Sequence, residues 1–168
     1  MSTKAVAISF IPIIVIGAIF ASYVALTPAA STPIYSMPPP NSHTSTSDGW
    51  QFNATISHAE MGLGVSGNLT YVGTSNATYD FGVPLILCEI QAQNGTIVWG
   101  EITTMLLRQQ TVAPGQTFSD STQVPTSQLV LGQTYTLLVF PQVSGNGFSG
   151  HSVEQSFSFS PLAVTSQP

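Results

Sequence analysis

An uncharged apolar run near the N-terminus constrains this chain more than any other feature. Residues 5–26 carry no charged side chain and are dominated by Ile, Val, Ala and Phe, and Lys4 stands directly before them. A helix of this length, at about 1.5 Å per residue, spans a bilayer core of about 30 Å. Because basic flanks stay in the cytoplasm, we predict a single-pass protein of the cell membrane whose C-terminal domain lies outside.

Two other interpretations of the apolar run stay open. A cleaved secretory signal ends in a small-x-small site, but Ala29 and Ala30 follow Pro28 and form no clean site of that kind, so we favour an uncleaved anchor. A pilin-type leader, cut after Lys4, would instead leave the apolar run to pack inside a filament. The sequence is compatible with that arrangement as well.

The segment after the apolar run cannot bury a core. It is rich in Pro, Ser and Thr and includes Pro38-Pro39-Pro40, which favours extended, polyproline-like conformations. We therefore predict four regions: an anchor or export signal over 1–26, a semi-rigid stalk over 27–48, an extracytoplasmic domain over 49–160 and a tail over 161–168.

The composition excludes one class of partner. Charged residues make up 5% of the chain, and its two basic residues are Lys4 and Arg108, whereas a typical soluble domain is about 25% charged. Phosphate binding needs clustered Lys and Arg, so we expect no nucleic-acid partner. The seven carboxylates would be neutral in a strongly acidic medium, which suits the outer face of an acidophile.

Four N-x-S/T sequons supply hydration that the missing charges do not. Their acceptor asparagines are Asn53, Asn68, Asn76 and Asn94. Clustered sequons behind an export segment predict an N-glycosylated domain outside the cell.

The pattern of the domain is that of an all-β fold. Short apolar and β-branched runs, separated by turn residues, recur at roughly ten-residue intervals. Trp50, Phe52, Ala54 and Ile56 alternate with polar residues, as a half-buried strand does. We predict an immunoglobulin-like sandwich of seven or eight antiparallel strands. After 50–56, the expected β segments are 63–72, 79–90, 97–99, 102–107, 118–124, 134–140 and 153–159.

Several residues refine this expectation. Gly67 is interpreted as a bulge or kink, and Pro84 as a bulge near the entry of the most apolar strand. Asn94-Gly95 predicts a tight hairpin turn. The aromatic residues expected in the core are Trp50, Trp99, Tyr135 and Phe140.

The search for chemistry finds no catalytic or cofactor motif. His43, His58 and His151, expected in the stalk, at a strand end and at the start of the last strand, lack metal-ligand spacing. Cys88 has apolar neighbours and is expected to be a buried thiol. Cys88 and His151 can meet across a sandwich, but a copper site needs a further His and a Met in a tight loop. We expect no metal or cofactor on this chain, and a non-catalytic subunit in preference to a free-standing enzyme.

Two charged residues are candidates for partner contacts. Glu89 lies in the most apolar strand, where burial would raise its pKa, although alternation favours the solvent face. Arg108 is the one basic residue after the predicted anchor, so it can contact an acidic partner or an anion. Pairing with Glu101 or Asp120 is an equally good interpretation.

Two functional hypotheses follow from this organisation. An anchor, a stalk and a complete sandwich would hold a binding domain beside a membrane partner, as an accessory subunit. Alternatively the chain is a structural subunit of a surface filament, in which the segment after a cleaved signal donates a strand to its neighbour. The candidate donor, residues 29–37, has few large apolar residues and is broken by Pro33, which favours the first hypothesis.

The chain also resembles a known family in its anchor, in Asn53-Ala54-Thr55-Ile56-Ser57, in Asn76-Ala77-Thr78-Tyr79 and in the turn Gln93-Asn94-Gly95-Thr96. These features look like the small subunit of the thiosulfate:quinone oxidoreductases of thermoacidophilic archaea. The resemblance implies a heteromer with a multi-span membrane protein, and electron transfer from thiosulfate to a quinone held by the partner subunit. The organisation is also similar to that of archaeal thread and pilin subunits.

Overall fold

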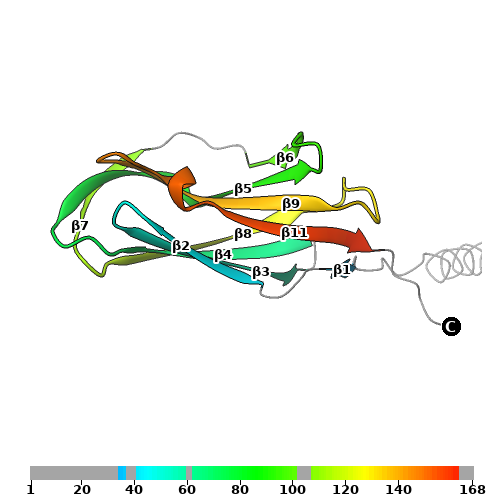
Figure 1. Ribbon diagram of the computed structural model, residues 1–168, viewed down its shortest axis with the longest axis horizontal. Helices are drawn as coiled ribbons and strands as arrows, with labels where there is room; N and C mark the ends of the chain where they lie inside the picture. Colours follow the sequence, from blue (N-terminus) through cyan, green and yellow to red (C-terminus); the bar gives the residue numbers. More distant parts are fainter. Residues whose placement is uncertain (1–33, 37–40, 60–61, 102–106, 163–168) are drawn as a thin grey trace, which may run out of the picture. The chain divides into compact units, whose positions relative to one another are not determined.

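The computed structural model describes residues 34–36, 41–59, 62–101 and 107–162, all within one compact unit over residues 32–168. These residues form two antiparallel sheets packed as layers (Figure 1), so the prediction of an all-β domain is confirmed. In chain order the elements are β1 (Ile34–Ser36), β2 (Ser42–Ser47), β3 (Trp50–Ala59), β4 (Gly62–Tyr71), β5 (Ala77–Ala92), β6 (Ile97–Gly100), β7 (Arg108–Val112), β8 (Thr117–Pro125), β9 (Tyr135–Gly145), β10 (Phe148–Ser149), the 3₁₀ helix η1 (Gly150–Val153) and β11 (Gln155–Leu162).

The chain passes repeatedly between the two sheets. The larger sheet has the order β1-β11-β9-β5-β6, with β10 paired to β9 and β7 paired to β5, and the smaller sheet has the order β2-β3-β4-β8. After the β2-β3-β4 meander, β5 joins the larger sheet, β8 returns to the smaller one, and β9 pairs with β5. The described residues hold eleven strands, more than the seven or eight expected, because β1, β2 and β10 are short additions.

The core lies between the sheets and follows the alternation seen in the sequence. Along β3, Trp50, Phe52 and Ala54 are fully buried while Gln51 between them is exposed. Trp50 is the centre of an aromatic cluster, with ring centroids of neighbouring side chains 5.1 to 6.2 Å away: Tyr71, Tyr79, Phe81, Phe118 and Phe148. Since aromatic rings bury large apolar areas, this cluster anchors one end of the sandwich.

The predicted stalk is wrong for residues 42–47, because they form β2 and pair with β3 along its length. Ser and Thr lack the apolar alternation that marks a half-buried strand, yet their hydroxyls satisfy neighbouring polar groups. Asn53 Nδ2 donates to Thr44 Oγ1 at 2.7 Å, and Ser45 Oγ donates to the carbonyl of Val153 at 2.7 Å. The domain therefore begins before Gly49, and at its other end β11 extends beyond the predicted boundary to Leu162.

A bulge was expected at Pro84 and a bulge or kink at Gly67, and the structure differs between the two positions. Pro84 lies where β5 shifts register between Phe81 and Ile86, as expected, and follows a cis peptide bond. Gly67 causes no bulge, since β4 pairs continuously with β3 and β8 there. A Cβ at Gly67 would lie 2.6 Å from Ile86 Cδ1 and 2.8 Å from Phe52 Cε2, so this glycine allows the two sheets to pack closely.

Some predictions fall wholly or partly outside the described residues. The predicted transmembrane helix over 5–26 is one of them, and most of the expected segment 102–107 is another. No helix within the described ranges is long and apolar enough to span a bilayer. The last predicted strand begins later than expected, because residues 150–153 form η1 instead.

Candidate functional site

The four sequon asparagines lie away from the core. Asn53 and Asn68 are direct Cα partners on the outer face of the smaller sheet, Asn76 lies between β4 and β5, and Asn94 lies in the turn between β5 and β6. Asn68, Asn76 and Asn94 are exposed, and Asn53 is half-buried. The three exposed positions are open to an attached glycan, whereas the Nδ2 atom of Asn53 donates a hydrogen bond to Thr44 Oγ1 at 2.7 Å.

The outer face of the smaller sheet is polar but uncharged. Hydroxyls and amides on neighbouring strands form short side-chain ladders across it: Thr70 and Thr117 Oγ1 atoms lie 2.9 Å apart, and Ser119 Oγ donates to Asn68 Oδ1 at 2.6 Å. Polar side chains that satisfy one another keep such a face hydrated without charge. This face also has an open hollow of about 460 Å³ beside Ser57 and Gln123.

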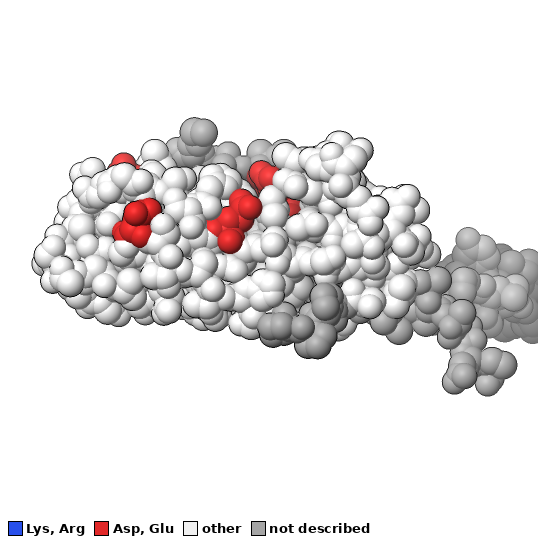
Figure 2. Space-filling view, viewed as in Figure 1, with Lys and Arg blue, Asp and Glu red and all other residues white. Residues whose placement is uncertain are grey.

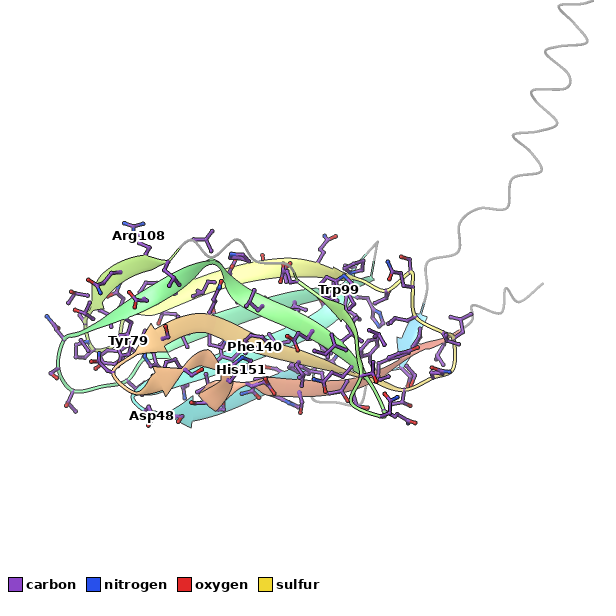
Figure 3. All side chains as sticks on the ribbon, turned by 90° about the horizontal axis from the view of Figure 1, so that it is seen from above. Asp48, Tyr79, Trp99, Arg108, Phe140 and His151 are labelled. Atoms are coloured by element: carbon purple, nitrogen blue, oxygen red, sulfur yellow. The ribbon has the colours of Figure 1, made fainter. Side chains whose placement is uncertain are left out.

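The structure does not bring Glu89 and Arg108 together. Glu89 is half-buried in the second half of β5, opposite Leu138 and Gly100, while Arg108 begins β7 opposite Phe81. Because inward Cys88 and Ile90 flank it, Glu89 points to the outer face, as its alternation predicted. Arg108 is exposed and extends away from the sheets (Figure 3).

The predicted pairing of Arg108 with Glu101 or Asp120 is absent among the described residues. Both carboxylates bind other groups instead. Asp120 Oδ2 accepts hydrogen bonds from the backbone N–H groups of Leu85 at 2.9 Å and Ile86 at 3.3 Å, and Glu101 Oε1 accepts one from Thr122 Oγ1 at 3.1 Å. These carboxylates therefore connect β8 to the larger sheet.

The three histidines lie on three different elements. His43 belongs to β2, and its ring stacks on Phe157 with centroids 4.5 Å apart; His58 lies in β3, near its end, as predicted. His151 belongs to η1, where Nδ1 lies 3.1 Å from Glu154 Oε2. Within the described ranges no three His, Cys, Asp or Glu side chains gather as metal ligands.

Cys88 is a buried thiol, as predicted. It has no exposed surface and is part of the main core, whereas His151 is exposed, so the two are not brought together. Burial raises the pKa of the Cys88 thiol, and the nearby charges of Glu101 and Asp120 raise it further. A protonated, enclosed thiol is a poor nucleophile and a poor metal ligand.

A groove on the outer face of the larger sheet was missed by sequence reasoning. It has a volume of about 260 Å³ and lies between β5, β9 and η1, with a mainly apolar lining that includes Leu87, Phe140 and Pro141. Phe140 was expected in the core, but it is buried outside the main core cluster, with its ring 4.1 Å from that of His151. Figure 3 shows the two side chains close together on this side of the sheet.

One polar atom of the groove has no partner among the described side chains and backbone. The Oε1 atom of Gln142 is buried there without a hydrogen bond, and its side chain packs over Gly82. No local sequence signal marks this groove, since it depends on how η1 folds over β9.

The structure thus presents three surfaces: an uncharged face with two sequons, an exposed arginine beside β5, and an apolar groove under η1. No protein family model matches the chain, and no curated protein matches it.

Proposed function

We propose that this chain is a membrane-anchored, N-glycosylated accessory subunit that acts through contacts of its extracytoplasmic domain. The placement of the sequons is the observation that carries the proposal. Four acceptor asparagines lie outside the core of a domain with few charges, and attached glycans would supply the hydration that such a surface needs.

The connectivity supports an immunoglobulin-like sandwich. In that fold, strands A, B and E share one sheet and strands C, F and G share the other. Here β3, β4 and β8 have the neighbours of A, B and E, and β5, β9 and β11 have those of C, F and G. Folds of this kind commonly act as binding modules, which fits a subunit without a cofactor of its own.

Three carboxylates of the domain have hydrogen-bond partners within it. Asp120 and Glu101 hold the sheets together, and Glu154 contacts His151. The Oε2 atom of Glu101 is nevertheless buried without a hydrogen-bond partner among the described residues. By contrast, Arg108 is exposed and free of ion pairs among the described residues, so it is available to a partner's carboxylate.

The partner that we propose is a multi-span membrane protein, in a heteromer similar to a thiosulfate:quinone oxidoreductase. The quinone chemistry would belong to that partner, and Glu89 and Arg108 would contact it. The N-terminal anchor would keep the domain beside it.

Mass spectrometry of the native chain tests the proposal. We expect an intact N-terminal segment in the membrane fraction and glycan masses on the sequon asparagines. The Asn53→Gln, Asn68→Gln, Asn76→Gln and Asn94→Gln variants should each remove the mass found at that site. An unmodified chain recovered from the cytoplasm would refute the proposal.

The filament remains a second candidate, because one observation favours it. Strand β1 lies within the donor segment proposed from the sequence and pairs with β11 over Ile34↔Leu162 to Ser36↔Ser160. The same edge can accept that strand from a neighbouring copy.

A disulfide between positions 36 and 160 separates the two candidates. Cross-strand Cα partners lie about 4.5–5.5 Å apart, within the range a disulfide bridges. In the accessory subunit, Ser36→Cys with Ser160→Cys gives an intrachain bond and a monomer on a non-reducing gel. A ladder of covalent oligomers would instead support strand exchange in a filament.

A further inference from the structure

The exposed apolar side chains of the domain gather at one end of the sandwich. The described residues include eight large hydrophobic residues that are exposed. Five of them lie at the end of the sandwich that carries β1, and we call them the apolar end: Ile97, Val98, Val130, Leu131 and Leu162. Residues 92–94 and 132–134 line one hollow there, and Ile34 of β1 is the Cα partner of Leu162.

Two hydrogen bonds hold the turn that carries Val130 and Leu131. The N–H of Val130 donates to Tyr135 Oη at 3.0 Å, and the N–H of Gly132 donates to the carbonyl of Pro161 at 2.8 Å. Leu129 packs against the core on the inner side. Val130 and Leu131 are therefore fixed outward, with exposed fractions of 56% and 55%.

The described charged residues lie elsewhere. In the view of Figure 2 the acidic side chains lie over the middle and the far part of the sandwich, and the described surface near β1 is uncharged. Among described residues, the charged ones are all on other parts of the strands and turns: Asp48, Asp80, Glu89, Glu101, Arg108, Asp120 and Glu154. Glu60 lies outside the described ranges, but it connects Ala59 to Gly62, and Gly62 pairs with Pro125, the residue of β8 after which the turn with Val130 and Leu131 follows.

A short connection joins this end of the domain to the apolar run of the sequence. Seven residues separate Leu26, the last of the apolar run, from Ile34, and an extended chain covers at most about 3.6 Å per residue. Leu26 and Ile34 are therefore at most about 30 Å apart. With residues 5–26 anchored as proposed, a connection of this length favours the apolar end over the opposite end for contact with the bilayer.

We infer that the apolar end rests on the lipid bilayer, with Val130 and Leu131 inserted between the headgroups. This inference depends on the membrane anchor of the proposed function. Apolar side chains without charge partition into the boundary between headgroups and acyl chains. Asn94 lines the hollow at this same end, so the inference requires a glycan on Asn94 to lie in the polar headgroup region, about 5–7 Å deep on each side, or in the water beyond it.

A fluorescent label at Leu131 tests the contact. The full chain carrying Leu131→Cys is labelled with an environment-sensitive dye and reconstituted through its N-terminal segment into phosphatidylcholine vesicles. Cys88 is buried and protonated, so it takes no label. The matched control is Val72→Cys, which is 46% exposed near the opposite end of the sandwich, where its N–H donates to the carbonyl of Gly49.

The expected result is a blue-shifted emission from position 131 that shallow nitroxide-labelled lipids quench, and neither effect at position 72. Equal, unquenched emission from both positions on vesicles that float with the protein would overturn the inference while leaving the anchor intact. A blue shift without lipid quenching would also overturn it, because a protein surface would then cover this end. Failure of the protein to float with the vesicles would refute the anchor and the inference together.

Discussion

The carboxylate of Asp120 on β8 accepts a hydrogen bond from the backbone N–H of Leu85 on β5 at 2.9 Å, and so joins the two sheets. The same oxygen accepts the N–H of Ile86 at 3.3 Å. These two donors lie where β5 leaves the ladder of β9, between Phe81 and Ile86. Asp120 thus satisfies backbone groups that the register shift at Pro84 leaves without strand partners.

Removing this carboxylate should destabilise the domain. In Asp120→Ala, two partly buried N–H groups lose a charged acceptor, and we expect the free energy of unfolding to fall by about 1–3 kcal/mol. Urea denaturation followed by fluorescence measures the change. The control is Glu89→Ala, a half-buried carboxylate on the outer face of β5, which should change stability by less than about 0.5 kcal/mol. Equal effects of the two variants would contradict the role of Asp120.

Gly67 should not tolerate a side chain. The Cβ of Gly67→Ala would lie closer to Phe52 and Ile86 than van der Waals contact permits, and overpacking of this kind costs about 1–3 kcal/mol. In the control, Gly100→Ala, the Cβ meets nothing nearer than 3.7 Å, so stability should stay the same or rise slightly. Thermal melts of both variants provide the measurement, and a Gly67→Ala protein as stable as the Gly100→Ala protein would show that the sheets do not pack as described.

Trp50 provides a test of the aromatic cluster. Its side chain is fully buried, and Nε1 has no hydrogen-bond partner among the described residues. Trp50→Ala removes the large ring and should cost about 3–5 kcal/mol. Trp50→Phe leaves a smaller cavity and removes the unsatisfied N–H, so it should cost clearly less than Trp50→Ala. Denaturant midpoints that are equally low for both variants would contradict this account.

The raised pKa of Cys88 predicts that the native thiol reacts slowly and that the free energy of unfolding falls at high pH. The native thiol should resist alkylation at pH 8, and urea should expose it to rapid modification. Above about pH 9 the unfolded chain loses this proton while the folded chain keeps it, so stability falls as pH rises, by at most about 1.4 kcal/mol per pH unit. Cys88→Ala should remove that part of the slope. Rapid labelling of the native thiol would argue against its burial.

The alternation along 50–56 and the apolar run of 79–90 were sufficient to predict an all-β domain and the burial of Cys88. The strand β2 was not predictable from its own residues, because its Ser and Thr side chains gain their partners on β3 and from Gln155, which are distant in sequence. The role of Asp120 depends on the register shift in β5. The groove beside Phe140 depends on η1, so neither could be found from local patterns.

Isolation of the native protein from its own membranes in a mild detergent tests the central claim most directly. Mass spectrometry then identifies the N-terminus of the chain and every protein that co-purifies with it. An accessory subunit predicts an intact N-terminal segment and a multi-span membrane protein in fixed stoichiometry. Homopolymeric filaments of a chain that begins after Lys4 or near Ser31 would contradict the claim and make this a structural protein of the cell surface.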